Sequence, residues 1–311
     1  MLGHITARRY IFSITALDTL KLPEYKGSTL RGGFGHAFRK VVCTFRGKEC
    51  DACLLRQRCV YSYVFETPPP EGTTKMTKYL RAPHPFVIEP PAGKKQLYRP
   101  GEELTFGLVL IGRADDYLPY FIYAFDEMGK DFGIGRGNGK YRLDRVDCEG
   151  VSIYDGTTGT LKPPTPHTPL PSPHSSLNTQ HSSLLTLRFL TPTRLINSGS
   201  LEPDPDFRTL VRALLRRFSL LSYFHCGREL EADFKGLIER AGSVETVNKR
   251  LRWRDWERYS SRQDTRMKMG GFVGEIAFAG ELAEFLPFLE AGELVHLGKG
   301  TGFGLGRYEI R

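Results

Sequence analysis

A chain of 311 residues can bury sizeable cores, and this length predicts about two domains. The net charge of +9 and the pI near 9.2 favour a polyanionic partner. No apolar run approaches the roughly 20 residues that span a bilayer, and the first residues alternate like a strand without the apolar stretch of a signal peptide. We therefore expect a cytoplasmic protein with no membrane partner.

The first half alternates between strand-like and helix-like patterns. In chain order we predict a strand over 5–14, a glycine-interrupted helix from about Ser28 to Val42, a strand at 103–112, a helix at 115–129 and a glycine-rich return at 133–139. This order is a βαβ arrangement followed by a further helix and strand.

Four of the six cysteines fall in an insertion of the first half, at 43–66. The spacing Cys43-x6-Cys50-x2-Cys53-x5-Cys59 supplies enough thiolates to close a tetrahedral site, so we predict a structural zinc ion. An iron–sulfur cluster uses the same number of thiolates, and the spacing does not separate the two. Reduced cysteines without a ligand are the remaining alternative.

A segment rich in Pro, Ser, Thr and His at 161–183 has little to bury, which predicts a flexible linker. The second half then reads as a strand from Leu184, a helix from about Asp204 to Cys226, a short helix, an Arg/Trp-rich segment at 249–268, a strand at 269–279, a helix at 281–290 and a final strand.

The same glycine punctuation occurs in both halves. Alternate glycines from Gly133 to Gly139 precede Lys140 and Tyr141, and alternate glycines from Gly300 to Gly306 precede Arg307 and Tyr308. We interpret the chain as an internal duplication of a ferredoxin-like βαββαβ unit. Glycine at every second position strips one face of side chains, so that another backbone or a phosphodiester chain can approach, although such runs also form ordinary turns. We interpret the kinase-like Asp-Phe-Gly sequence at 131–133 as a coincidence.

Two such halves, each with a glycine-rich loop before its last strand, resemble the RAMP superfamily of CRISPR-associated proteins, and in particular the endoribonucleases that cut CRISPR repeat RNA. The segments that carry the resemblance are 25–43, 50–66, 258–276 and 294–310. It implies an α+β fold of two tandem ferredoxin-like domains, RAMP- and RRM-like, over 1–160 and 184–311. It also implies metal-independent transesterification by the ribose 2′-OH, which leaves a 2′,3′-cyclic phosphate and a 5′-OH.

The resemblance implies that a histidine of the first helix is the general acid or base, with a tyrosine and a lysine as helpers. We assign these roles to His36, Tyr25 and Lys40 as a hypothesis. Positions 36 and 40 share a face of a helix. His225, at the end of the long basic helix, is a rival because the helix dipole favours its protonated form. His296, before the second glycine run, could contact the RNA backbone, and it is equally compatible with a histidine packed in the core.

Basic and aromatic residues interleave at 249–268, with eight basic against three acidic side chains. Arginine pairs with phosphates through its planar fork, and exposed aromatic rings stack on bases. A solvated basic face over buried tryptophans is the alternative. Backbone N–H groups of the second glycine run could line a phosphate-binding concavity. The residues that we predict to bind RNA are Arg31, Arg252, Arg254, Arg258, Tyr259, Arg262, Lys268, Lys299, Gly300, Gly302, Gly304 and Arg307.

We therefore expect an endoribonuclease of CRISPR repeat RNA in antiviral defense, with a structural zinc ion and no catalytic metal. One rival is a RAMP subunit that binds guide RNA inside a larger CRISPR effector complex without cleaving it. Another is an iron–sulfur or redox protein organised around the cysteines, which visible absorbance of the purified protein would favour.

Overall fold

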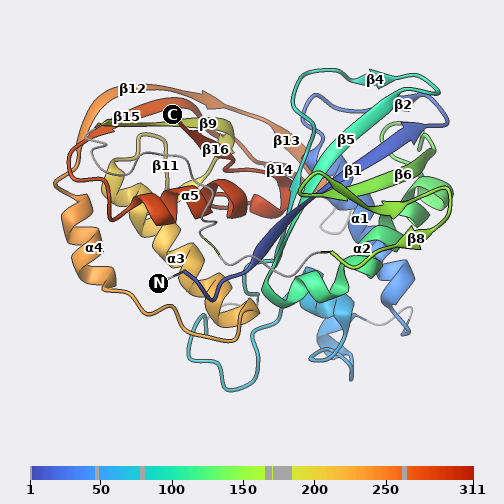
Figure 1. The fold of residues 1–311 in the computed structure, drawn as a ribbon, viewed down its shortest axis with the longest axis horizontal. Helices are drawn as coiled ribbons and strands as arrows, with labels where there is room; N and C mark the ends of the chain where they lie inside the picture. Colours follow the sequence, from blue (N-terminus) through green and yellow to red (C-terminus); the bar gives the residue numbers. More distant parts are fainter. Residues whose placement is uncertain (1, 46–48, 78–80, 165–169, 171–183, 261–264) are drawn as a thin grey trace. The chain divides into compact units, whose positions relative to one another are not determined.

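The computed structural model describes residues 2–45, 49–77, 81–164, 170, 184–260 and 265–311 (Figure 1). The chain divides into two compact units. The N-terminal unit comprises Ala7–His167 and Phe224–Cys226, and the C-terminal unit comprises Met1–Thr6, Thr168–Tyr223 and Gly227–Arg311. Most of the predicted linker lies outside the described residues. No helix in the described ranges is long and apolar enough to cross a bilayer.

The N-terminal unit is built on an antiparallel sheet with the strand order β3-β5-β1-β6-β7-β8. Its strands are β1 (Ala7–Ala16), β3 (Phe86–Glu89), β5 (Glu103–Ile111), β6 (Tyr141–Cys148), β7 (Val151–Asp155) and β8 (Thr160–Leu161), and β2 (Leu20–Lys21) pairs with β4 (Leu97–Tyr98) apart from them. Its helices are α1 (Gly27–Val42) and α2 (Leu118–Glu127), with short turns of helix at η1 (Cys50–Ala52), η2 (Ser62–Glu66), η3 (Gly112–Tyr117) and η4 (Met128–Phe132).

Both helices of the N-terminal unit pack on one face of its sheet. Alternation along β1 buries Tyr10, Phe12 and Ile14. Phe34 of α1 stacks on Phe125 of α2 with ring centres 4.6 Å apart, and Phe125 lies 5.0 Å from Phe12. The order β1, α1, β3, β5, α2, β6 with these antiparallel neighbours is the ferredoxin-like topology.

The C-terminal unit repeats this topology. Its sheet has the order β12-β15-β9-β16, from β9 (Leu184–Thr193), β12 (Glu245–Arg254), β15 (Gly271–Ala279) and β16 (Tyr308–Ile310). Its helices are α3 (Phe207–His225), α4 (Phe234–Ala241) and α5 (Leu286–Val295), with η5 (Thr301–Phe303) in the glycine run. Two hairpins are added, β10 (Leu195–Asn197) with β11 (Ser200–Glu202), and β13 (Glu257–Ser260) with β14 (Thr265–Lys268).

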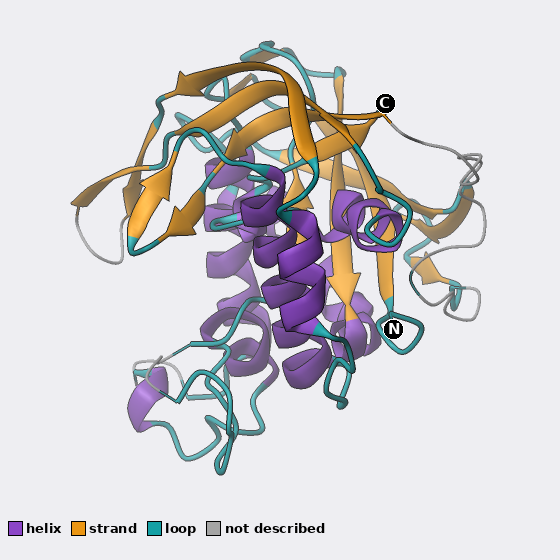
Figure 2. Cartoon of the chain, turned by 90° about the vertical axis from the view of Figure 1, so that its left-hand side faces the viewer, coloured by secondary structure: helices purple, strands orange, loops and turns teal. Residues whose placement is uncertain are grey.

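Helices α3 and α5 lie under the sheet of the C-terminal unit (Figure 2). Phe207 of α3 contacts Phe278 of β15 with ring centres 4.9 Å apart, and it also contacts Phe285 just before α5. Arg217 of α3 is buried, and it donates two N–H groups to the carbonyl oxygen of Val295 at the end of α5. The predicted fold class is therefore confirmed in both halves.

Two elements of the second half differ from the sequence prediction. The Arg/Trp-rich segment contains most of strand β12 and the hairpin β13–β14, where we predicted no strand. The helix predicted at 281–290 begins only at Leu286, because Pro287 occupies its first turn, where proline is favoured.

Candidate functional site

Helix α1 presents His36 and Lys40 on its solvent side. Its apolar positions Leu30, Phe34 and Phe38 are buried, which leaves positions 36 and 40 exposed on the opposite side, one turn apart. The ring of His36 meets the ring of Phe132 edge-on with centres 4.7 Å apart. The Lys40 ammonium lies 4.8 Å from the centre of the same ring. Phe132 therefore connects the two residues that the sequence proposed for catalysis.

Asp131 anchors Lys40 beside this ring. The Lys40 Nζ lies 2.7 Å from Asp131 Oδ2, and Lys140 Nζ donates to the Asp131 carbonyl oxygen at 2.6 Å. The hydrogen bond from Lys40 and then its charge lower the pKa of Asp131. Asp131 and Phe132 directly precede Gly133, so the first glycine run begins at this site. The Asp-Phe-Gly sequence that we interpreted as a coincidence thus contacts both candidate catalytic residues.

The rings of two other histidines are buried and have hydrogen-bond partners within the protein. His225 is buried, with the Tyr63 hydroxyl 3.2 Å from its Nδ1 and the Pro83 carbonyl oxygen 2.7 Å from its Nε2. His296 is fully buried, with Nδ1 3.2 Å from the Leu305 carbonyl oxygen. Neither ring is presented to solvent, where a substrate could exchange a proton with it.

His84 is poorly suited to proton transfer near neutral pH. Burial first, and then the charges of Arg31 and Arg81, lower its pKa to about 3. Its Nε2 lies 3.1 Å from Arg31 Nη2 and its Nδ1 lies 3.0 Å from Thr67 Oγ1. Arg31, which we predicted to bind RNA, is thereby held inside the unit, with its guanidinium 5.1 Å from the centre of the Phe65 ring.

Tyr25 precedes α1, whose first residue, Gly27, lies roughly 14 Å along the helix axis from His36 at 1.5 Å per residue. Tyr25 is half-buried. Its role as a helper of His36 stays a prediction. The neighbouring Lys26 is buried and donates to the Glu24 carbonyl oxygen, and burial lowers its pKa.

The second glycine run is mostly packed against the chain itself. Gly302 and Gly304 are buried, Gly300 is half-buried, and a Cβ at Gly306 would collide with the Leu297 carbonyl oxygen. The flanking Lys299 is exposed. The glycines therefore let the backbone of the protein itself pack closely against the run. The exposed cation, Lys299, lies directly before the first glycine of the run.

The predicted RNA-binding residues of the hairpin fall into several environments. Arg258 is partly buried, lies 4.6 Å from the centre of the Phe303 ring, and donates to Met267 Sδ. Burial lowers the pKa of Arg258. Lys268 is exposed. The side chain of Tyr259, and Arg262 as a whole, lie outside the described residues.

Three further predicted RNA-binding residues lie on strands or at their ends. Arg252 is exposed, while Arg254 and Arg307 are half-buried. The backbone N–H of Arg307 donates to Thr191 Oγ1 at 2.9 Å. Of these three, Arg252 presents the most accessible guanidinium.

All four cysteines of the predicted metal site are free and half-buried. Burial first, and then the charge of Glu66, raise the pKa of the Cys50 thiol. Among the described residues, which include Cys43, Cys50, Cys53 and Cys59, no three His, Cys, Asp or Glu side chains form a group that could hold a metal. The structure does not assemble the four-thiolate site, and zinc stays a prediction.

Family models match both halves of the chain. Residues 5–166 match AF_1859_N, described as an N-terminal domain, and residues 187–308 match the CRISPR-associated endoribonuclease Cas6. An uncharacterized protein of Archaeoglobus fulgidus is 30% identical over 141 residues, which are 44% of this chain and 45% of that protein. The chain thus matches less than half of that relative's length.

Solved structures share the fold along nearly the whole chain. The product complex of Cas6 (TTHB231) has a TM-score of 0.59 at 19% identity over 98% of this chain and 99% of that one. Thermus thermophilus Cas6 (TTHB231) has a TM-score of 0.56 at 18% identity over 99% of each chain. A partial Cas6-RT-Cas1–Cas2 complex has a TM-score of 0.54 at 12% identity over 99% of this chain and 46% of that one. These likenesses show the common fold.

Proposed function

From the match of residues 187–308 to the CRISPR-associated endoribonuclease Cas6, we propose that the chain belongs to this family and cuts CRISPR repeat RNA to release guide RNAs. The proposed reaction is a transesterification that needs no metal. The ribose 2′-OH attacks its own 3′ phosphate, the bond from phosphorus to the 5′ oxygen breaks, and the products carry a 2′,3′-cyclic phosphate and a 5′-OH. A proton must leave the 2′ oxygen and another must reach the 5′ oxygen.

The observation that carries this proposal is the exposure of His36. Among the described histidines, His36 has an exposed side chain, whereas the rings of His4, His84, His225 and His296 make hydrogen bonds within the protein. Imidazole suits proton transfer at neutral pH because its ordinary pKa lies close to neutrality. We assign His36 one of the two proton transfers.

Lys40 complements His36 by charge. Its ammonium lies one helical turn away and is held by Asp131, so it is positioned before RNA binds. A phosphate that enters the site accepts hydrogen bonds from this ammonium and competes with the Asp131 carboxylate. Stabilisation of the charge that develops on the non-bridging oxygens is the role we assign to Lys40. Tyr25 is retained as a proposed helper that acts outside this pair.

The remaining predicted cations would hold the RNA. Lys268, Lys299 and Arg252 are exposed and can reach a phosphate without rearrangement of the protein. Arg31 and Arg258 make contacts within their own units, so a smaller share of the binding is assigned to them. Assembly with other CRISPR proteins is compatible with both the cleaving and the non-cleaving function.

End-labelled repeat RNA in excess chelator tests the proposal. We expect the wild type to cut the RNA under single-turnover conditions and to leave a cyclic phosphate, detected by end-group analysis. His36→Ala should slow cleavage by about 10²- to 10⁴-fold, the usual contribution of a general acid or base, with RNA affinity retained.

The matched control is His225→Gln, with melting curves to confirm that the variants are folded. It should cleave at the wild-type rate. Absence of cleavage by the wild type would favour the non-cleaving RAMP subunit. Loss of cleavage in His225→Gln, with full activity in His36→Ala, would reassign the acid or base.

A further inference from the structure

The sheet of the C-terminal unit has a charged face opposite α3 and α5. Alternation along β9 buries Leu187 and Phe189 toward the helices and leaves Arg188 on the other side. The strand register places Arg188 opposite Glu309 on β16 and opposite Glu275 on β15. It also places Glu275 opposite Arg250 on β12. A row of charges therefore crosses the sheet.

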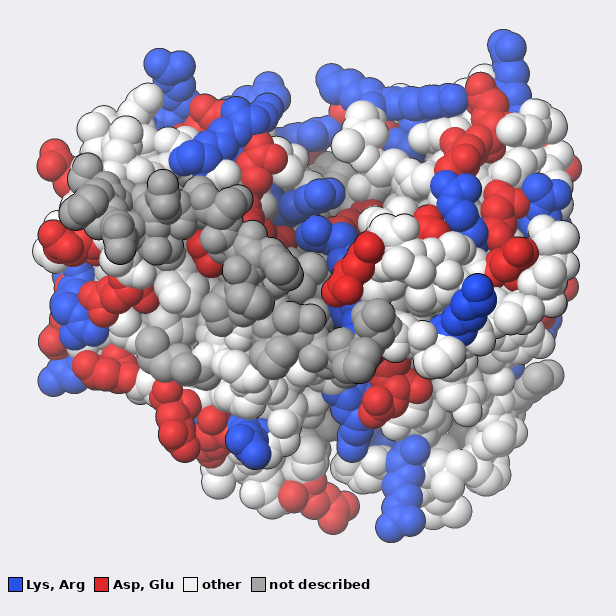
Figure 3. Space-filling view, viewed as in Figure 1, with Lys and Arg blue, Asp and Glu red and all other residues white. Residues whose placement is uncertain are grey.

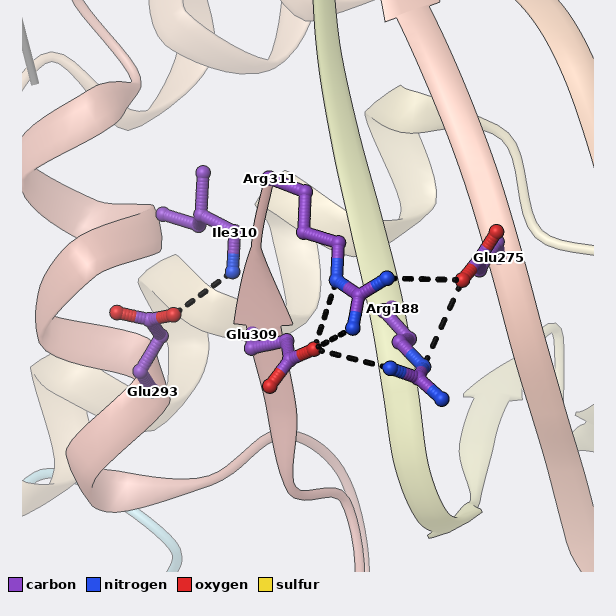
Figure 4. Close-up of polar contacts among 6 residues, drawn as sticks. All are labelled: Arg188, Glu275, Glu293, Glu309, Ile310 and Arg311. Carbon is purple, nitrogen blue, oxygen red and sulfur yellow. Dashed lines mark hydrogen bonds and ion pairs between the residues drawn. The ribbon is translucent and has the colours of Figure 1, made fainter.

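The β16 end of this row is electrically balanced (Figure 4). Arg188 lies 3.5 Å from Glu275 and 3.4 Å from Glu309. Arg311 lies 3.7 Å from Glu275 and 2.7 Å from Glu309. Two guanidinium groups and two carboxylates thus satisfy one another, and this end of the row has little excess charge for a ligand.

The β12 end carries excess positive charge. Arg250, Arg252 and Arg254 follow at every second position and therefore point to one side of the strand. Arg250 and Arg252 are exposed and make no ion pair with a described residue. Figure 3 shows several Lys and Arg side chains at the upper left of the view, where Figure 1 labels β12 and β15, with Asp and Glu side chains among them.

A pocket of about 330 Å³ lies at this end of the sheet. The three arginines of β12 line it together with Arg188, and Glu275 is its carboxylate. Because Arg188 already pairs with Glu275, the excess positive charge of the pocket comes from Arg250 and Arg252, and this charge selects an anion. The volume falls at the lower end of the roughly 300–1,000 Å³ that small-molecule pockets occupy, which suits one or two nucleotide units.

We propose that this pocket, which we call the β12 arginine pocket, binds successive phosphates of single-stranded RNA. Alternate residues of a strand are about 6.6 Å apart, which is close to the repeat between phosphates of an extended polynucleotide. RRM domains bind single-stranded RNA on the same kind of four-stranded sheet by stacking bases on aromatic rings. Here Arg188 and Glu275 occupy the central strands at the pocket, so the pocket reads the RNA backbone and tolerates any base sequence. The biological role of this pocket, holding RNA next to the cut repeat, rests on the proposed function.

The salt dependence of binding to a labelled decauridylate tests the pocket. Each phosphate contact contributes about 0.7 to the slope of log K against log salt for a single strand. Arg250→Gln/Arg252→Gln should therefore lower the slope by about 1.4 and weaken binding about 25-fold at 0.1 M salt. Arg250→Lys/Arg252→Lys keeps both charges and should retain the wild-type slope.

The matched control removes two charges elsewhere in the same unit. Lys235→Gln/Arg240→Gln acts on α4, where the cations already pair with Glu239 and Glu284. It should leave the slope within experimental error. An equal fall in slope in this control, an unchanged slope in the glutamine variant, or a lost slope in the folded lysine variant would each overturn the proposal.

The outcome is separable from that of the proposed function, because the decauridylate contains no repeat sequence and its binding requires no cleavage. In parallel, the Lys235→Gln/Arg240→Gln control should cut repeat RNA at the wild-type rate when the enzyme is saturating. A wild type that never cuts but shows the expected slopes would refute the nuclease and keep the pocket.

Discussion

The interior polar cluster around His84 makes stability depend on pH in a calculable way. Thr67 and Arg31 approach the two ring nitrogens of His84, and neither Arg31 nor Arg81 tolerates a second positive charge beside it. The pKa of His84 is lowered from 6.5 to about 3, first by burial and then by these arginines. The folded protein therefore keeps this ring neutral throughout the mildly acidic range.

Proton linkage gives the size and sign of the effect. Between pH 6.5 and about pH 3 the unfolded chain binds a proton at His84 that the folded chain does not, so stability falls as pH falls. The free energy of unfolding should decrease by about 2 kcal/mol between pH 8 and pH 5 through this residue alone. The figure at pH 5 depends mainly on the unfolded pKa, because the folded pKa lies far below that pH.

Urea unfolding at pH 8, 6 and 5, followed by circular dichroism, measures this loss. His84→Gln removes the titration, so the difference in unfolding free energy between pH 8 and pH 5 should be about 2 kcal/mol smaller than in the wild type. His36→Gln is the matched control, since it removes an exposed histidine and should leave the wild-type pH dependence. A His84→Gln variant with the full pH dependence of the wild type would refute the burial of this ring.

Three further predictions concern packing and metal content. Gly306→Ala should lower the free energy of unfolding in urea by more than about 3 kcal/mol, because φ is +74° and the new methyl group meets a carbonyl oxygen. Gly137→Ala, with φ of +89° and open space around it, should lower it by only about 1–2 kcal/mol. Equal losses would contradict the packing of the second glycine run. Lys26→Met should raise the free energy of unfolding by about 1 kcal/mol because it removes a buried charge. Lys21→Met, at an exposed position, should change this free energy by less than about 0.5 kcal/mol. A lower free energy of unfolding in Lys26→Met would show that the fold needs the Lys26 ammonium. We also propose one structural zinc per chain, which emission spectrometry of the purified protein should detect and Cys53→Ser should reduce; protein free of metal would leave the thiols unliganded.

Periodicity predicted those elements whose two sides differ in polarity. Strand β1 alternates between buried and solvent-facing residues, and α3 carries a continuous apolar stripe, so both were expected from the sequence. Strand β12 was not predicted because it is an edge strand that is exposed or half-exposed along its whole length, so its residues do not alternate between apolar and polar. Edge strands with many charges look like irregular basic segments in a sequence.

The candidate site could be predicted only in part for a similar reason. The spacing of His36 and Lys40 within one helix is local, and the sequence alone places them on one face. Their neighbours Asp131 and Phe132 lie about 90 residues further along the chain, at a distance in sequence that no periodicity connects. The one available signal was their position directly before the first glycine run, which the duplication singles out.

The duplication predicts the same topology in both units, but the two glycine runs make different contacts. In the N-terminal unit, the residues before the run hold Lys40 and contact His36. In the C-terminal unit, the guanidinium of Arg258, from the hairpin β13–β14, lies over the ring of Phe303 within the run. Because function depends on side chains placed on a fold, equal topology does not imply equal chemistry. We thus assign the proposed proton transfers to the first copy and the proposed binding of the RNA backbone to the arginines of the second copy.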